Sequence, residues 1–303
     1  MPYSNTGSVK PGHKRIEPGR ILIHIIFLFT SITVITPILY LLAISFSTDM
    51  DIAINGYRLI PENPTLAAYS YIFRAPKQIL NAYGVSILAT VMGTAVGLTL
   101  SSTIAYTMTR KDYRYYKITT FFVFFTMLFN GGLVPWYIVV TKFANIGDTI
   151  FALFLPYGVS AWFTMLMKGF MQDVPFEIIE AAKIDGGNEF RIFTSIVLPL
   201  VKPGLATIGL FYAFAYWNDW WLAMLYISNE SLVPLQFMLY RNMTNLQFLL
   251  NNISSSLSVD MKQIPTESTR MAMAVLVAGP MLMVFPFFQK YFVKGLTVGS
   301  VKG

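Results

Sequence analysis

The sequence predicts an all-α membrane protein with six transmembrane helices. Hydrophobic residues make up 55% of the 303 residues and charged residues only 12%, whereas a soluble domain has roughly 25% charged residues. So few charges cannot cover a globule of this size with polar surface, and most of the chain must therefore lie in lipid. Six apolar runs reach the length of a bilayer crossing, about 17–25 residues, and such runs must be helices because lipid offers their backbone groups no partners. The six predicted spans are Ile21–Phe46, Val85–Met108, Ile118–Val140, Ile150–Met167, Gly204–Ile227 and Met271–Tyr291.

Residues 1–20 form a basic segment before the first span. The apolar run that follows is too long for a signal-peptide core of about 7–15 residues and has no small-residue cleavage site, so we expect a retained span. If residues 1–20 are cytoplasmic, the inner segments carry fifteen of the 22 lysines and arginines and the outer segments carry seven. This asymmetry predicts that the N- and C-termini are both cytoplasmic.

The net charge of +7 does not indicate a nucleic-acid partner. The basic residues stand in short clusters beside apolar runs, which is typical of membrane topology, and they form no continuous face. Cysteine is absent, which excludes disulfides and thiolate metal sites. His13 and His24 stand apart from carboxylates and from each other, so no metal site is predicted.

Glycine and proline predict how the spans pack and where they break. Gly93 and Gly97 in the second span have G-x-x-x-G spacing, which indicates close helix packing within the chain; a dimer contact is the alternative. The stretch "NGGLVP", Asn130–Pro135, predicts a break in the third span. Prolines are expected to interrupt several spans where protein or a water-filled cavity satisfies the freed backbone groups; they are Pro37, Pro135, Pro156, Pro280 (in Gly279-Pro280) and Pro286.

A charged stretch between the fourth and fifth spans, residues 172–203, predicts a cytoplasmic helical hairpin. Pro175 suits the first turn of a helix, and Phe176–Ile184 alternates apolar and polar residues at helical spacing. Gly186-Gly187 supplies the left-handed turn that ends this helix.

The second half of this stretch predicts a second short helix, Glu189–Leu198, capped by Asn188. Pro199 closes that helix, and Pro203 leads into the fifth span. The two helices together would lie across the cytoplasmic mouth of the spans. A solvated connector between the fourth and fifth spans is the alternative.

Three motifs carry a resemblance to a known family. The pattern E-A-A, three residues, G, nine residues, I-x-L-P runs from Glu180 to Pro199; "WNDWW" is Trp217–Trp221; and the chain ends in "QKYFVKGLTVGSVKG", Gln289–Gly303. Together they resemble the permease subunits of bacterial binding-protein-dependent ABC importers with the type I fold, in particular the maltose-type sugar permeases. "FNGGLVPWYIVV", Phe129–Val140, is similar to the branch for oligosaccharides and polysaccharide fragments.

The resemblance implies a multi-pass transport subunit in the bacterial cell membrane that forms half of a carbohydrate pathway and is not an enzyme. It implies as partners a second homologous permease in a heterodimer, two ATPase subunits that hold ATP and Mg²⁺, and an extracellular solute-binding protein. The sequence agrees, because it contains no GxxxxGK[ST] phosphate loop and no cofactor site is predicted. The implied organisation is a cytoplasmic segment 1–20, a permease domain 21–291 and a cytoplasmic tail 292–303.

The resemblance further implies that the hairpin couples the spans to the ATPase subunits. Glu180 would pair with a basic residue of the ATPase, and the small residues beside it would permit close seating. The implied coupling residues are Glu180, Ala181, Ala182, Asp185, Gly186, Ile196, Leu198 and Pro199. The tail is implied to dock at the ATPase interface, with a flexible polar terminus as the alternative; its residues are Gly295, Leu296, Thr297, Gly299, Lys302 and Gly303.

Aromatic and planar polar side chains suit a sugar pathway. Asp219 is expected to face a cavity, water or a partner, because a carboxylate at a span centre costs about 2.5–3.5 kcal/mol; outward snorkelling is the alternative. For the aromatic residues the alternative is an interfacial belt that touches no ligand. The candidates are Asn130, Trp136, Tyr212, Tyr216, Trp217, Asn218, Asp219, Trp220 and Trp221.

Two long outer segments, Ser47–Gly84 and Ser228–Thr269, remain. Within the second, the amphipathic stretch Leu232–Asn252 is expected to lie along the membrane surface or to receive the binding protein. The alternative functions are an ion-coupled secondary carrier, an ABC permease for a non-sugar solute, and a membrane-bound assembly or signalling component. A secondary carrier requires ionisable residues deep in several spans, and only Asp219 qualifies.

Overall fold

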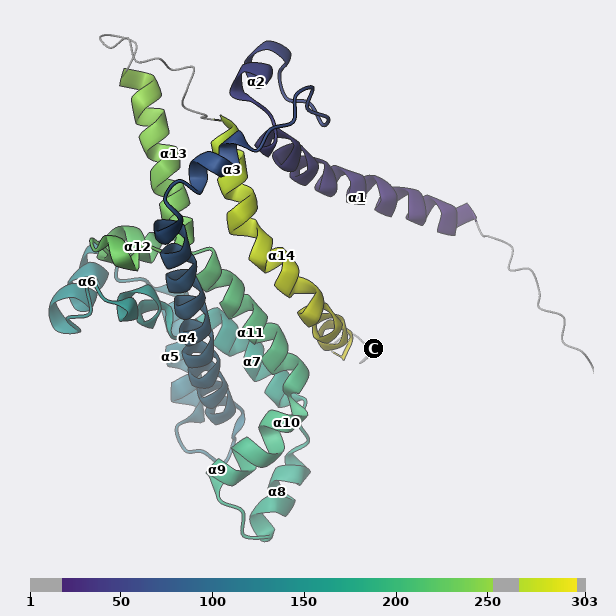
Figure 1. Cartoon of the computed structure of the whole chain (residues 1–303). Coiled ribbons are helices and arrows are strands. Elements are labelled where there is room, and N and C mark those ends of the chain that lie inside the picture. Colours follow the sequence, from purple (N-terminus) through teal and green to yellow (C-terminus); the bar gives the residue numbers. More distant parts are fainter. Residues whose placement is uncertain (1–17, 253–266, 299–303) are drawn as a thin grey trace, which may run out of the picture.

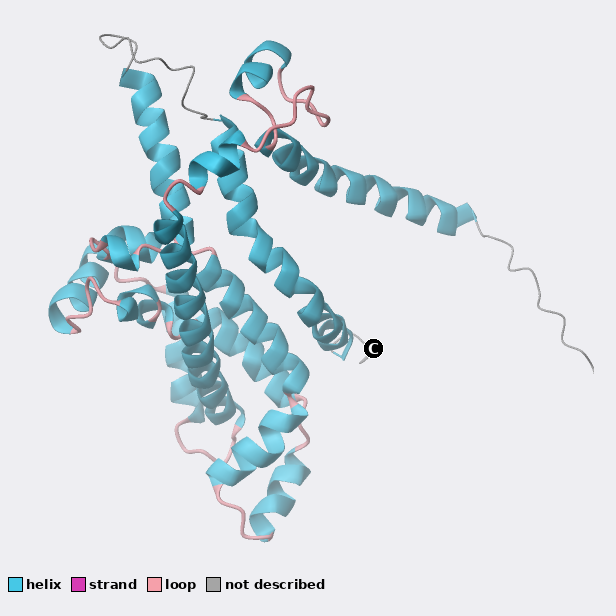
Figure 2. Ribbon diagram, viewed as in Figure 1, coloured by secondary structure: helices cyan, strands magenta, loops and turns pink. Residues whose placement is uncertain are grey.

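The computed structural model describes residues 18–252 and 267–298, and within them every regular element is helical (Figures 1 and 2). In chain order the elements are α1 (Pro18–Ser45), α2 (Asp49–Asn55), α3 (Ala67–Ile72), α4 (Pro76–Thr109), α5 (Tyr116–Leu128), α6 (Leu133–Ile138), η1 (Val139–Phe143), η2 (Ile150–Leu153), η3 (Leu155–Tyr157), α7 (Ala161–Gln172), α8 (Phe176–Ile184), α9 (Glu189–Ile192), η4 (Phe193–Val197), α10 (Leu198–Leu200), α11 (Lys202–Trp217), α12 (Trp221–Tyr226), η5 (Glu230–Leu232), α13 (Leu235–Asn252) and α14 (Glu267–Val298).

Three helices in the described residues are long and apolar enough to cross a membrane by themselves, namely α1, α4 and α14. Three further crossings arise only if pairs of bent helices are each counted as one span. The pairs are Tyr116–Leu128 with Leu133–Phe143, bent by 115°; Ile150–Tyr157 with Ala161–Gln172, bent by 55°; and Glu189–Leu200 with Lys202–Trp217, bent by 84°. The chain is thus an all-helical membrane protein with three to six candidate spans.

The predicted break in the third span is confirmed. α5 ends at Leu128 and α6 begins at Leu133, and Gly132 between them has φ 87°, a left-handed conformation that favours glycine. The predicted fourth span is broken as well, because Pro156 lies in the short helix η3 and not in a continuous α-helix. The predicted fifth span is interrupted between α11 and α12, at Asn218.

The expected interruptions at three other prolines are wrong. Pro37 lies inside α1, and Pro280 and Pro286 lie inside α14, and both helices continue through them. A proline removes one backbone hydrogen bond and kinks a helix, and transmembrane helices tolerate this where neighbouring groups compensate. A full break occurs at Gly131-Gly132, because glycine permits the left-handed conformation that Gly132 adopts there.

The core of the bundle depends on close packing between α4 and α11. A Cβ atom at Gly93 would lie 2.6 Å from the ring of Tyr216, and one at Gly97 would lie 2.6 Å from the ring of Tyr212. The two glycines of the G-x-x-x-G motif therefore seat two tyrosines of the same chain. The predicted packing within the chain is confirmed at this motif.

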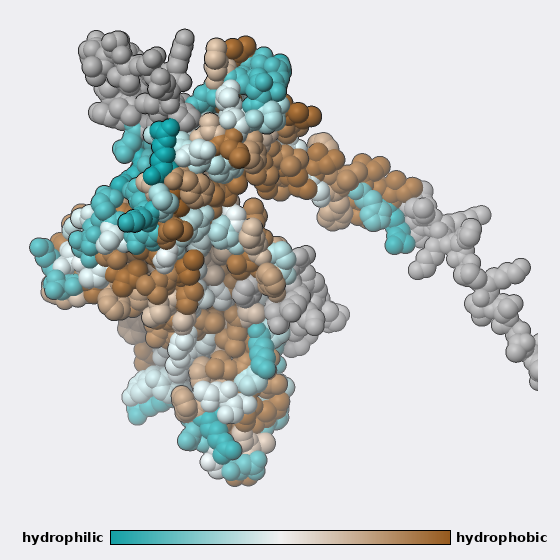
Figure 3. Space-filling view, viewed as in Figure 1, coloured by the Kyte–Doolittle hydropathy of each residue, from teal (hydrophilic) through white to brown (hydrophobic). Residues whose placement is uncertain are grey.

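The molecule has two polar ends and an apolar middle. The helices α8, α9 and α10 project at one end, which we call the hairpin end, and α2, α3 and α13 lie at the other, which we call the opposite end (Figure 1). On the face seen in Figure 3, hydrophobic residues cover much of the surface between these ends and most of α1, which extends away from the bundle. Only the last turn of α1 is buried, at Ala43, Ile44 and Ser45.

Candidate functional site

The first helix of the hairpin has the predicted bounds, because its flanking residues determine both ends. α8 begins at Phe176 after Pro175, whose ψ of 132° is extended, and ends at Ile184 with Asp185 as its C-cap. Gly186 then has φ 79°, which side-chain-bearing residues rarely adopt. Gly187 is equally constrained, since a Cβ there would lie 2.7 Å from the carbonyl oxygen of Ala182.

The second helix is capped as predicted but runs further. The Asn188 side chain accepts a hydrogen bond from the Arg191 backbone N–H at 2.8 Å. The helix then continues through α9, η4 and α10 to Leu200, so the prediction that Pro199 closes it is wrong. The turn before Pro199 is π-helical, with the Leu198 N–H bonded to the Phe193 carbonyl. This wider turn accommodates a ring that would clash in a regular α-helix.

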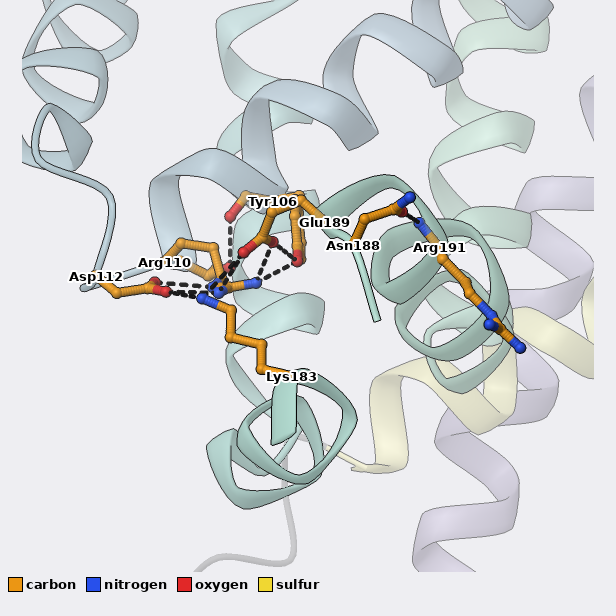
Figure 4. Close-up of polar contacts among 8 residues, drawn as sticks. Tyr106, Arg110, Asp112, Lys183, Asn188, Glu189 and Arg191 are labelled. Carbon is orange, nitrogen blue, oxygen red and sulfur yellow. Dashed lines mark hydrogen bonds and ion pairs between the residues drawn. The ribbon is translucent and has the colours of Figure 1, made fainter. Parts of the chain in front are cut away.

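A cluster of charged side chains fastens the hairpin to the end of α4 (Figure 4). We call it the anchor cluster; it consists of Tyr106, Arg110, Asp112, Lys183 and Glu189. The Arg110 side chain is only 4% exposed and donates to Glu189 at 2.7 and 3.0 Å and to Asp112 at 3.0 and 2.7 Å. Lys183 of α8 bonds to Asp112 and lies 3.0 Å from Glu189. Tyr106 donates to Glu189 at 2.7 Å.

The four charged members of the anchor cluster, Arg110, Asp112, Lys183 and Glu189, stay ionised over a wide pH range. The hydrogen bond from Arg110 lowers the pKa of the Asp112 carboxyl well below its usual range, while partial burial opposes this and the hydrogen bond from Lys183 adds to it. Hydrogen bonds to Asp112 and then Glu189 raise the pKa of Lys183. Burial works against the charged guanidinium of Arg110, but its hydrogen bond to Asp112 and the nearby charges raise its pKa overall. The cluster therefore acts as a fixed electrostatic joint.

This joint was not predicted from the sequence, where Arg110 and Lys183 count only among the basic residues of the inner segments and Glu189 only as the start of the second hairpin helix. The one local signal is Arg110 followed by Asp112 at the end of a predicted span. The partner of Arg110 stands 79 residues further along the chain, and spacing in a single sequence does not reveal such a pairing.

The predicted coupling residues lie mainly on the outward side of the hairpin. Glu180, Ala181, Asp185, Gly186 and Pro199 are exposed, while Ala182, Ile196 and Leu198 are partly buried. Two large apolar side chains stand beside them: Ile184 is 86% exposed and Phe190 is 75% exposed. Figure 1 shows that α8 and α9, which carry these residues, project from one end of the bundle. The hairpin thus has one side bound to its own chain and one free apolar side.

The described part of the predicted tail site is helical. Gly295, Leu296 and Thr297 fall within α14, which extends to Val298. Gly299, Lys302 and Gly303 lie outside the described residues, as does His13. Within the described residues no group of three or more potential metal ligands occurs.

The structure places Tyr212 and Tyr216 in the core and not along an open pathway. The Tyr212 hydroxyl lies 2.6 Å from Ser101 Oγ and accepts from the Ser160 N–H at 3.0 Å. The Tyr216 hydroxyl donates to the Phe154 carbonyl at 3.0 Å. Because both rings are buried and both hydroxyls are satisfied, the two tyrosines contribute to packing. Trp217 is buried too, and its Nε1–H donates to the Val277 carbonyl at 2.9 Å.

The remaining pathway candidates shape chain breaks. Asn130 Oδ1 accepts from the Gly132 N–H at 2.8 Å, and Asn218 Nδ2 donates to the Phe214 carbonyl at 2.9 Å. Asp219 Oδ2 accepts from the Leu222 N–H at 3.1 Å, so its carboxylate caps the first turn of α12. Trp136 is exposed on α6.

The remaining tryptophans, Trp220 and Trp221, follow the same break. Their rings meet edge to face, and the ring of Trp220 also stacks on Tyr240 of α13. The structure thus brings Asn218, Asp219 and these two tryptophans together at the junction of α11 and α12, and it places Asn130 and Trp136 at the separate break between α5 and α6.

Comparisons with known proteins agree in pointing to one family. Residues 97–298 match the family described as "Binding-protein-dependent transport system inner membrane component". Protein LplC of Bacillus subtilis is 40% identical over 271 residues, which cover 89% of this chain and 90% of that protein. The polygalacturonan/rhamnogalacturonan transport system permease protein YtcP of Bacillus subtilis is 38% identical over 93% of this chain and 97% of its own length. The crystal structure of a bacterial ABC transporter involved in the import of the acidic polysaccharide alginate contains a similar chain, with a TM-score of 0.77, 26% identity, and coverage of 93% of this chain and 100% of that one.

Proposed function

Because the chain belongs to the family of inner membrane components of binding-protein-dependent transport systems, we propose that it forms half of the translocation pathway of an ATP-driven oligosaccharide importer. Membership in the family makes it a multi-pass transport subunit of the inner membrane and not an enzyme. The proposed topology is six spans, with the three bent pairs counted as crossings and both termini in the cytoplasm. The hairpin end is then cytoplasmic and the opposite end is extracytoplasmic.

The proposed partners follow from the division of labour in such an importer. Two ATPase subunits bind ATP and Mg²⁺, a second permease of similar fold completes the pathway, and a solute-binding protein delivers the sugar at the opposite end. The carbohydrate substrate is supported by relatives: besides YtcP, the arabinooligosaccharides transport system permease protein AraQ of Halalkalibacterium halodurans is 27% identical over 93% of this chain. The 292–303 tail keeps its predicted role within this proposal, and so do the pathway candidates other than the buried Tyr212, Tyr216 and Trp217.

The observation that carries the proposal is the two-sided hairpin. Its outward side exposes Ile184, Phe190 and Ala181 for a cleft on the ATPase. Its inward side is bound to α4 through Arg110. Its second helix leads through one bend into α11. Closure of the ATPase pair would therefore move α4 and α11 together.

The energies favour the whole hairpin as the lever over any single contact. Moving a two-state membrane domain from 1:99 to 99:1 takes about 5.5 kcal/mol of differential binding. An exposed salt bridge, such as one that Glu180 would form with the ATPase, contributes only roughly 0–1 kcal/mol. Most of the required free energy must therefore come from the packed surface around Ile184 and Phe190, and Glu180 sets the register.

Gly186→Pro tests the proposal, because proline requires φ near −65° where Gly186 has 79°. We expect the variant to insert into the membrane normally but to hydrolyse ATP without import, or to lose its ATPase subunits on purification. Gly56→Pro is the matched control, since Gly56 has φ 70° at the opposite end; it should retain the ATPase subunits. Normal coupled uptake by Gly186→Pro would refute the lever. Uptake driven by a proton gradient without any ATPase would instead favour the secondary carrier.

A further inference from the structure

A pocket of about 360 Å³ lies between α5 and α7, and all of its lining residues belong to these two helices. It is close to the hairpin end, because α5 begins at Tyr116 shortly after the end of α4, and α7 ends at Gln172 shortly before the hairpin. Its volume falls in the range of small-molecule sites, about 300–1,000 Å³. None of the predicted coupling residues or pathway candidates lines it.

The lining of this pocket changes from basic to apolar with distance from the hairpin end. Lys117 lies in the first turn of α5, and Phe124 lies seven residues further along the helix, which is about 10 Å. α7 ends where α5 begins, so Lys168 is its lining residue nearest the hairpin end and Met165 lies about one turn further away. Two lysines from two helices thus stand at one end of the pocket, and Phe121, Phe124 and Met165 line the rest. A phospholipid has the same order of parts, a charged headgroup followed by acyl chains.

Neither lysine is neutralised by the part of the chain that the structure describes. No ion pair there involves Lys117 or Lys168, and no acidic residue lines the pocket. Asp112 is the one acidic residue of the loop between α4 and α5, and it is bound to Arg110 and Lys183 in the anchor cluster. Lys168 stands about one turn inside the end of an apolar helix, where an ammonium group is costly without a counter-charge or water. The pocket therefore presents two uncompensated positive charges.

Tyrosines around the pocket indicate that it lies at the level of the lipid headgroups. Tyr116 lines it, and the Lys117 ammonium lies over the Tyr116 ring, 5.9 Å from the ring centroid. Tyr113 and Tyr115 precede it on the loop and are exposed. Tyrosine concentrates at the interface between water and hydrocarbon, where the phosphate groups of lipids lie. Basic pockets between spans on the cytoplasmic side are suited to anionic headgroups.

We propose that this pocket binds an anionic phospholipid of the cytoplasmic leaflet. Its phosphate would lie between the ammonium groups of Lys117 and Lys168, and an acyl chain would lie along Phe121 and Phe124. The chemistry recognised at the lysines is that of a phosphate, and the apolar part of the lining favours a lipid over free phosphate as its source. A zwitterionic lipid carries its own ammonium group beside the phosphate, so it would compensate the two lysines less well. The inference goes beyond sugar transport, because it needs only the membrane location of the chain and the cytoplasmic position of its hairpin end.

The test is native mass spectrometry of the full-length chain with the subunits that co-purify with it. The complex is titrated in detergent with phosphatidylglycerol or with phosphatidylcholine of the same acyl chains. We expect phosphatidylglycerol to bind about tenfold or more tightly than phosphatidylcholine. Lys117→Gln combined with Lys168→Gln should weaken phosphatidylglycerol binding by about 10- to 30-fold, because each lysine near an anionic lipid contributes a several-fold factor.

Two further variants separate the pocket from general charge. Lys117→Arg combined with Lys168→Arg keeps both positive charges and should bind phosphatidylglycerol like the wild type. Lys111→Gln combined with Lys202→Gln is the matched control, because it removes the same charge near the same end from exposed residues that do not line the pocket. It should also bind like the wild type.

Three results would overturn the proposal. Equal binding of the two lipids would show that the pocket does not select a negative charge, and equal losses in the glutamine pocket variant and its control would show only general attraction to a basic surface. Displacement of the lipid by an equal concentration of glycerol phosphate, which has no acyl chain, would assign the pocket to a free phosphate. Crosslinking of Lys117 to a co-purified subunit, without retained phosphatidylglycerol, would assign the lysines to a protein carboxylate.

Discussion

Arg110 offers the sharpest test of how the hairpin is held. Arg110→Met removes the guanidinium but retains a long apolar side chain in a site where Arg110 is 4% exposed. Removing one partner of a buried ion pair costs about 3–5 kcal/mol. Here the two acidic partners, Asp112 and Glu189, are 37% and 55% exposed and keep access to water. Lys183 also stays beside both. We therefore expect a smaller loss, about 2–3 kcal/mol.

This loss would act mainly on the docking of the hairpin, because the anchor cluster joins the hairpin to the end of α4. It corresponds to about a 30- to 150-fold shift toward an undocked hairpin. It is about half the size of the 5.5 kcal/mol that a full switch requires, so an undocked hairpin would transmit the stroke of the ATPase poorly to α4. Hydrogen exchange of residues 176–200 should accelerate by a similar factor, and sugar imported per ATP hydrolysed should fall, while membrane insertion and the melting temperature of the bundle change little.

Arg114→Met is the matched control, because it removes the same charge from the same loop. The Arg114 guanidinium lies over the ring of Tyr115 at 5.7 Å and takes no part in the anchor cluster. We expect wild-type exchange and coupling in this variant. Indistinguishable behaviour of the two variants would show that the anchor cluster does not hold the hairpin.

Three further predictions concern pH, packing and the tail. The pKa of Asp112 is lowered, so its contribution to docking is present above the unfolded pKa of about 3.9 and is lost as pH falls through the folded pKa. Protection of the hairpin from hydrogen exchange should therefore be constant from about pH 5 to neutrality and drop only below about pH 4. A drop near pH 6 would contradict the role given to Asp112. Gly93→Ala should destabilise the bundle by about 1–3 kcal/mol in thermal unfolding because its Cβ meets Tyr216, whereas Gly84→Ala, which meets nothing, should be neutral or slightly stabilising. Deleting Thr297–Gly303 should lower ATP-coupled uptake without loss of insertion; undiminished coupling would leave the tail no docking role.

Local chemistry explains why the sequence predicted the hairpin well. Both ends of α8 follow from residues beside them, Pro175 and Gly186, and the cap at Asn188 depends on a residue only three positions away. The same holds for the break at Gly131-Gly132. Backbone conformation imposed by proline and glycine is readable in one sequence because it needs no distant partner.

Features that depend on distant partners were not predictable in this way. Tyr212 and Tyr216 look the same in a sequence whether they line a pathway or fill a core, and the answer lies in the glycines of another span. The pairing of Arg110 with Glu189 requires α4 and the hairpin to meet. In each case tertiary contact, and not local pattern, decides the role.

The π-helical turn η4 lets the helix run through Pro199 without a break. Such a turn holds one residue more than an α-helical turn. Deleting one residue between Phe193 and Val197 would restore ordinary winding, and the flanking turns would keep nearly the same relative rotation. The ring of Pro199 would then meet the carbonyl four residues before it, as in any regular α-helix. A lost codon in this segment should therefore bend the exit of the hairpin at Pro199 while leaving the anchor cluster encoded.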